Sequence, residues 1–235
     1  EVREDLADME ASISSADRAF GRIVDSIRNA GLEGETIVMF TADHGIPFPR
    51  VKMTLYDPGI EVSLVFSIPG LEGGGDREQM VSNIDIMPTL LDLLGLEQHK
   101  PSGLHGVSFA ELLRSAEPNT YVRRNEIFAE KTYHTYYDPM RAIRTDRWKL
   151  IANFEVSKAL NVSYDVQYHP PYELFDLQND PYEQTNLTGD PEYDSIRDRL
   201  ITRLREWMID PLIDGPMSQG AYRERMREFK NIEVS

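Results

Sequence analysis

The chain has 235 residues, 40% of them hydrophobic, which is enough for one large or two small soluble domains. Its 25 basic and 40 acidic residues give a formal net charge of -15, which repels phosphate backbones and anionic membrane surfaces, so neither nucleic acid nor a membrane is an expected partner. The absence of cysteine excludes disulfides, thiolate metal sites and a cysteine nucleophile within this chain.

The first third of the chain alternates helical and strand patterns. An apolar stripe at steps of three and four predicts a helix from Leu6 to Ile27. The apolar run 36–41 predicts a strand covered on both faces, as in a parallel sheet, and 62–68 repeats that signal. A second helix is expected over 84–94. These elements indicate an α/β layered domain over residues 1–120.

From about Pro118 the pattern changes to short aromatic and basic runs. They predict a small, mostly antiparallel sheet formed by 126–128, 141–144, 148–151 and 172–175. Apolar residues from Ile196 to Met208 recur at helical spacing and predict a helix that covers this sheet. We therefore expect a C-terminal α+β subdomain over residues 121–235.

A polar pair, Asp43 and His44, directly follows the first predicted strand, and Gly45 lets the backbone turn away behind it. In open α/β sheets ligands bind at the carboxyl ends of strands. An adjacent carboxylate and imidazole at such a position can face one cation. The alternative is an Asp-His pair that merely caps a turn, which is the better interpretation of the dipeptide alone.

The longer run from Thr41 to Gly59 resembles the metal-binding segment of sulfatases. That segment has an apolar strand, Asp-Asn or Asp-His, Gly, a Lys or Arg about eight residues on, and a Leu-Tyr helix start. Further similarity follows in the same order over nearly the whole chain: Ile68-Pro69-Gly70, Asp85 to Leu91, Gly106 to Phe109, Tyr172 to Leu177, Asp180-Pro181, Glu183, and Asn186-Leu187.

Within the sulfatases, two segments are most similar to the heparan N-sulfatase (sulfamidase) branch: Gly-Ile-Pro-Phe-Pro after His44, and Pro139-Met140-Arg141. The resemblance implies an alkaline-phosphatase-like α/β fold. This chain would supply the second half of a mostly parallel sheet flanked by helices, together with the small antiparallel subdomain.

The resemblance also implies roles for the residues around the pair. Asp43 and His44 would ligate a divalent cation, usually Ca²⁺, although the imidazole leaves Mn²⁺ or Zn²⁺ open. Lys52 would contact the sulfate oxygens as a catalytic residue, with a solvated loop lysine as the alternative. Arg50 is a second candidate for sulfate or substrate binding.

The family's nucleophile, a formylglycine made within Cys/Ser-x-Pro-x-Arg, has no counterpart in this chain. We therefore expect the nucleophile on an N-terminal half, either a separate chain or an omitted region, and expect that half as a physical partner because half a parallel sheet has unpaired edges. This chain alone should be inactive. The resemblance favours an extracytoplasmic location, and the charged first residues contain no signal peptide.

Further candidates for substrate binding lie in the predicted C-terminal subdomain. His134 lies among tyrosines and could face a sugar, although a tyrosine-rich surface loop is an equally good interpretation. Arg141 and Arg144 are predicted to make one face of their strand basic, which would serve either a substrate anion or internal salt bridges.

The function expected from these features is hydrolysis of a sulfuric ester or sulfamate on a sulfated sugar. A metal-dependent phosphodiesterase or phosphonate hydrolase of the same superfamily is the nearest alternative. An inactive module that binds sulfated glycans through Lys52 and the basic strand is an alternative of another class.

Overall fold

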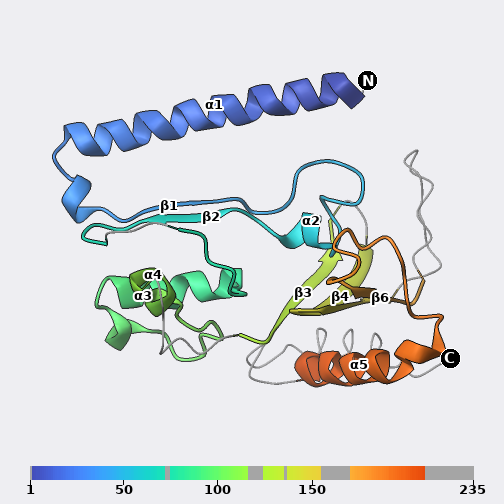
Figure 1. The fold of residues 1–235 in the computed structure, drawn as a ribbon. Coiled ribbons are helices and arrows are strands. Elements are labelled where there is room, and N and C mark those ends of the chain that lie inside the picture. The colour runs from blue at the N-terminus through green and yellow to red at the C-terminus, as the bar shows by residue number, and fades with distance from the viewer. Residues whose placement is uncertain (1, 72–74, 116–123, 135–136, 155–169, 210–235) are drawn as a thin grey trace. The chain divides into compact units, whose positions relative to one another are not determined.

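The computed structural model describes residues 2–71, 75–115, 124–134, 137–154 and 170–209 (Figure 1). The chain divides into two compact units. The first unit comprises residues 1–42 and 63–74, and the second unit comprises residues 43–62 and 75–235. The predicted domain boundary near residue 120 lies outside the described residues and stays a prediction.

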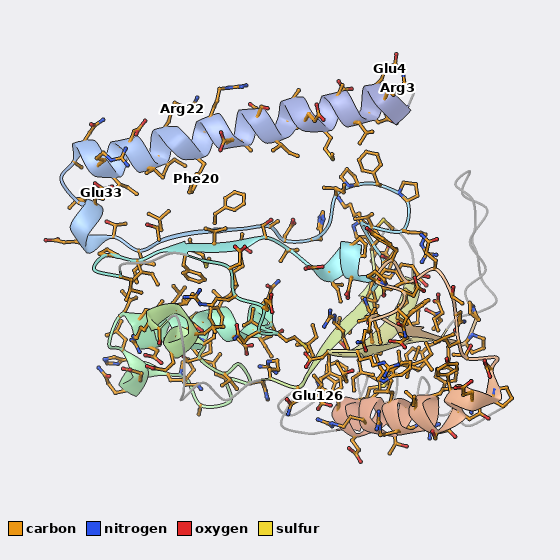
Figure 2. The ribbon with its side chains drawn as sticks, viewed as in Figure 1. Arg3, Glu4, Phe20, Arg22, Glu33 and Glu126 are labelled. Carbon is orange, nitrogen blue, oxygen red and sulfur yellow. The ribbon has the colours of Figure 1, made fainter. Side chains whose placement is uncertain are left out.

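The first unit contains a long helix and a two-stranded sheet. Helix α1 (Val2–Asn29) leads through the short 3-10 helix η1 (Glu33–Glu35) into strand β1 (Val38–Thr41), which pairs with β2 (Leu64–Ser67). Phe20 points from α1 toward β1, and its ring centroid is 5.5 Å from that of Phe40 (Figure 2). The predicted helix and both strands of this region are present.

The pairing of β1 differs from the expectation. Strands β1 and β2 are antiparallel, with Val38 opposite Ser67, and the described residues contain no parallel pair. Phe40 is 42% exposed, so the described residues do not cover β1 on both faces. The apolar run 36–41 reports a tendency to be buried, but it contains no information on the direction of the neighbouring strand.

The second unit is built around a four-stranded antiparallel sheet in the order β3-β4-β5-β6. Its strands are β3 (Glu126–Tyr133), β4 (Tyr137–Thr145), β5 (Trp148–Asn153) and β6 (Tyr172–Asp176). Its helical elements are α2 (Asp57–Ile60), η2 (Asn83–Asp85), α3 (Ile86–Leu93), η3 (Glu97–His99), α4 (Ala110–Arg114), η4 (Pro191–Tyr193) and α5 (Asp194–Ile209). The predicted antiparallel sheet and C-terminal helix are confirmed.

Both faces of this sheet are covered, because side chains alternate along each strand. On one face Ile143, Leu150 and Leu174 pack against α5 through Leu200, Leu204 and Met208. On the opposite face Met140, Ala142, Ile151 and Phe175 pack against Leu55 and Tyr56. The segment that follows the Asp43-His44 pair is therefore part of the core of the second unit.

Within the described residues, every helix is too short or too polar to traverse a lipid bilayer.

Candidate functional site

The Asp43 and His44 side chains lie next to each other. Oδ2 of Asp43 is 3.4 Å from Nε2 of His44. Nδ1 of His44 is 2.8 Å from the carbonyl oxygen of Gly45, and since a carbonyl only accepts, Nδ1 carries the proton in this contact. Nε2 thus faces the carboxylate, an arrangement that a cation between the two atoms would stabilise.

These two side chains fit as part of a cation site. A carboxylate oxygen and an imidazole nitrogen held by a backbone carbonyl are common metal ligands, and the side chains of Asp43 and His44 are 86% and 41% exposed. Among the described residues, no group of three or more His, Cys, Asp or Glu side chains could hold a metal ion. The metal role of Asp43 and His44 stays a prediction, and the other ligands of the metal would come from outside the described residues.

Gly45 is required by close backbone contacts. A Cβ at this position would lie 2.0 Å from the carbonyl oxygen of Pro58 and 2.7 Å from Cγ1 of Val51. The Gly45 amide donates to the carbonyl of Gly59 at 3.1 Å. The chain therefore folds back on itself directly behind the pair, and only glycine fits there.

Lys52 lies in the same folded-back segment. Its amide donates to the carbonyl of Ile46 at 3.1 Å, and the residue is half-buried. Within the described part of the chain, no hydrogen bond or ion pair involves its ammonium group. This placement is compatible with the predicted contact to a sulfate oxygen, which stays a prediction.

Arg50 is partly engaged within the protein. Its Nη2 donates to the backbone carbonyl of Glu183 at 2.5 Å, and its guanidinium lies 4.2 Å from the centre of the Tyr56 ring. The hydrogen bond attaches the loop to the segment that follows β6. Only the other guanidinium N–H groups would be available for the predicted substrate contact.

Arg141 is 3% exposed, and its guanidinium is used inside the sheet. Its nitrogens contact the carbonyls of Lys131 and Met140 at 2.9 Å each, Oγ1 of Thr132 at 3.1 Å and Oε2 of Glu130 at 3.1 Å. This arrangement favours the internal role that the sequence left open. Its substrate role stays a prediction without support from this geometry.

The predicted basic face of β4 is wrong. Arg144 reaches Asp57 at 3.2 Å, on the face of the sheet that carries Ala142, and Arg141 is three positions away. Residues an odd number of positions apart lie on opposite faces of a strand.

His134 is exposed just after β3, beside Tyr133, which is 67% exposed, so a substrate role for His134 stays a prediction.

A buried ionic cluster, Lys149, Asp57 and Glu183, was missed by the sequence reasoning. Lys149 is fully buried, and its Nζ lies 2.8 Å from both Oδ1 of Asp57 and Oε1 of Glu183. Oε2 of Glu183 accepts from the Asp57 amide at 2.6 Å. Burial raises the pKa of Glu183, and Lys149 opposes that shift. The sequence signal that could have revealed this cluster is a lysine inside the mostly apolar strand Trp148–Asn153.

Tyr56 belongs to a second buried contact in this region. Its hydroxyl donates to Oε2 of Glu173 at 2.6 Å, and burial raises its pKa far above the ordinary value. Nδ2 of Asn153 donates to the other carboxylate oxygen at 2.9 Å. The segment carrying Arg50 and Lys52 is therefore bound to the sheet by several charged and polar contacts.

The chain matches known proteins over this region. A family model described as N-sulphoglucosamine sulphohydrolase, C-terminal, matches residues 48–210. An ulvan-active sulfatase of Formosa agariphila is 32% identical over 75% of this chain and 38% of its own length. The human N-sulphoglucosamine sulphohydrolase is 27% identical over 96% of this chain and 52% of its length. The chain thus spans about half or less of these relatives.

Two solved structures share the fold. One, described in connection with the metabolism of multiple glycosaminoglycans by Bacteroides thetaiotaomicron, has a TM-score of 0.68 and 26% identity over 94% of this chain and 45% of its own. Another, in complex with its substrate D-glucosamine-2-N,6-O-disulfate, has a TM-score of 0.67 and 22% identity over 86% of this chain and 41% of its own. The predicted fold family is confirmed. The chain belongs to the sulfatase family, in the group defined by the C-terminal region of N-sulphoglucosamine sulphohydrolase.

Proposed function

We propose that this chain is the C-terminal part of a sulfatase that hydrolyses a sulfuric ester or a sulfamate on a sulfated sugar. The observation that supports this most is one folded-back loop that carries the adjacent Asp43 and His44 and, eight residues on from His44, Lys52. The family match covers Lys52 and the sheet that anchors it.

In this proposal the residues of the chain bind and orient the sulfate. Asp43 and His44 would hold a divalent cation, most simply Ca²⁺, which supplies positive charge to the sulfate oxygens. The Lys52 ammonium would donate to an oxygen on which charge develops as the bond to the sugar breaks. Arg50 would add a donor from the edge of the loop.

The rest of the proposed sulfatase would provide the nucleophile. The chain spans 38% and 52% of two sulfatase relatives and contains no cysteine. We include in the proposal an N-terminal partner region with a formylglycine, and an extracytoplasmic location that rests on the resemblance alone. The coding sequence upstream tests the first point, because a Cys/Ser-x-Pro-x-Arg motif must be present there.

The activity is tested on the full-length protein with an aryl sulfate and an aryl phosphate diester as parallel substrates. We expect turnover of the sulfate, lowered on the order of 10²- to 10³-fold by Lys52→Met, as for loss of one donor to a developing oxyanion. Lys100→Met, at an exposed lysine of the second unit, is the matched control and should be unchanged.

The same experiment separates the alternatives. Preferential turnover of the phosphate diester would identify a phosphodiesterase. Binding of a sulfated sugar without turnover of either substrate would identify a binding module, and either result would contradict the proposed sulfatase.

A further inference from the structure

The backbone around Lys52 is strained on both sides. Arg50 has φ of 61° and Met53 has φ of 71°, and the only other non-glycine residue with positive φ among those the structure describes is Glu183, at 54°. A left-handed conformation is unfavourable for a non-glycine residue and persists where surrounding contacts hold it. Two such residues within four positions indicate that this loop is held in place by its neighbours.

One contact that holds the loop comes from the antiparallel sheet. The carbonyl of Met53, next to Lys52, accepts a hydrogen bond from Nζ of Lys131 at 2.7 Å. Lys131 lies on β3 and also pairs with Asp138 on β4. A register irregularity between Lys131 and Tyr133 marks a bulge, a feature that redirects side chains locally.

Arg50 is held by the segment that follows β6. It donates to the carbonyl of Glu183, whose side chain is bound in turn by Lys149. The left-handed residues Arg50 and Glu183 thus meet through this single hydrogen bond. Lys131 and Glu183 together bind the loop on either side of Lys52.

We infer that Lys131 is a positioning residue for Lys52, an inference that rests on the proposed function. Within the described residues the Lys52 ammonium has no side-chain or backbone partner, so its location depends on the backbone that carries it. Lys131 holds that backbone through the Met53 carbonyl. Its side chain is 13% exposed, and it is too occupied by Asp138 and Met53 to act on a substrate itself.

A double-mutant cycle on the full-length enzyme tests this role. Lys131→Met should lower kcat for sulfate hydrolysis on the order of 10- to 100-fold, because a displacement of about 1 Å has effects of that size. KM should change by less than about threefold, since the loss is confined to the transition state. In a Lys52→Met background, Lys131→Met should have no further effect on kcat, because both changes remove the same interaction.

Three variants separate positioning from stability. Lys131→Arg, which keeps the charge and donors, should recover most of kcat. The double variant Lys131→Met with Asp138→Asn avoids an unpaired carboxylate and should behave like Lys131→Met. Glu126 lies on the same strand as Lys131 and pairs with Arg203 of α5. Glu126→Gln breaks that ion pair and should leave kcat unchanged.

Hydrogen exchange of the full-length protein provides a readout that is independent of catalysis. In Lys131→Met the amides of residues 45–56 should exchange faster, while those of β5 should not. Unchanged exchange in this loop, or an equal loss of kcat in the Lys52→Met background, would overturn the positioning role. If the wild-type enzyme turns over no sulfate, the proposed function fails, and faster loop exchange in Lys131→Met would still show that Lys131 holds the loop.

Discussion

The two units of the chain differ in how far they bury their apolar side chains. None of the described side chains in the first unit is buried, and Ile13, Ile23 and Val65 are each more than half exposed. In the second unit the sheet has covered faces on both sides, and even charged residues such as Lys149 are fully buried. The described residues of the first unit form amphipathic elements without a buried core, whereas those of the second unit form a core.

This difference shows what a hydrophobic pattern does and does not specify. The stripe on α1 and the alternation in the antiparallel sheet both predict which residues avoid water. Only in the second unit do the described residues supply the opposing surface. The stability of the two units should therefore respond differently to mutation.

The largest effect is expected at the buried cluster. Lys149→Met should lower the free energy of unfolding by about 3–5 kcal/mol, because it leaves the fully buried Glu183 carboxylate without its cation, while Asp57 keeps its contact with Arg144. Urea unfolding of the full-length protein measures this. Arg28→Met in the first unit, which breaks an exposed pair with Asp25, should cost less than about 1 kcal/mol. Equal costs would contradict the contrast between the units.

A pair of apolar truncations sharpens the comparison. Leu204→Ala, on the face of α5 that covers the sheet, should cost about 2–5 kcal/mol. Ile23→Ala on α1 tests the proposed partner region: if that region covers the stripe, the cost in the full-length protein should exceed the roughly 0.5 kcal/mol of a surface change.

The control for α1 is Arg22→Ala. Arg22 lies on the side of α1 opposite Phe20 (Figure 2), so its truncation should cost less than that of Ile23. Equal, small costs at both positions in the full-length protein would count against an N-terminal partner over this helix.

A smaller loss is expected at the loop itself. Gly45→Ala should destabilise the protein by about 1–3 kcal/mol, because the added Cβ overlaps the Pro58 carbonyl. It should also reduce sulfate turnover by displacing His44. Gly34→Ala in the first unit has no atom within 4 Å of the new Cβ and is the control. Thermal unfolding and turnover rates measure both variants, and a neutral Gly45→Ala would rule out the close approach.

The smallest effect is expected in acid. Two hydrogen bonds from Arg147, at 3.0 and 2.7 Å, lower the pKa of Asp176. A lowered pKa contributes stability that is present above the unfolded value of about 3.9 and is lost as the pH falls through the folded value. In Asp176→Asn, the urea concentration at the unfolding midpoint should therefore fall less steeply with decreasing pH below about 4 than in the wild-type protein. The same pH dependence of the urea midpoint in both proteins would exclude this contribution of Asp176.

Much of the second unit could be predicted from local patterns. The runs 126–128, 141–144, 148–151 and 172–175 lie within β3 to β6, and the helical spacing after Ile196 lies within α5. These elements follow from short-range alternation. In the site, the adjacency of Asp43 and His44 followed from their order in the chain.

Other features depended on residues far apart in sequence. The pairing of Lys149 with Asp57 spans 92 positions, and that of Tyr56 with Glu173 spans 117. The role of Arg141 stayed open between a substrate anion and internal salt bridges, because its contacts to β3 are invisible in a linear pattern.

By itself, the sequence determined the helices, the strands and the order of motifs that places the chain among sulfatases, because these depend on residue spacing along one segment. Only the tertiary structure decided the direction of β1 against β2, the burial of Lys149 and the attachment of the Lys52 loop to Lys131. Those features arise where distant segments meet, and the energy of a contact depends on both partners and on the solvent that the meeting excludes.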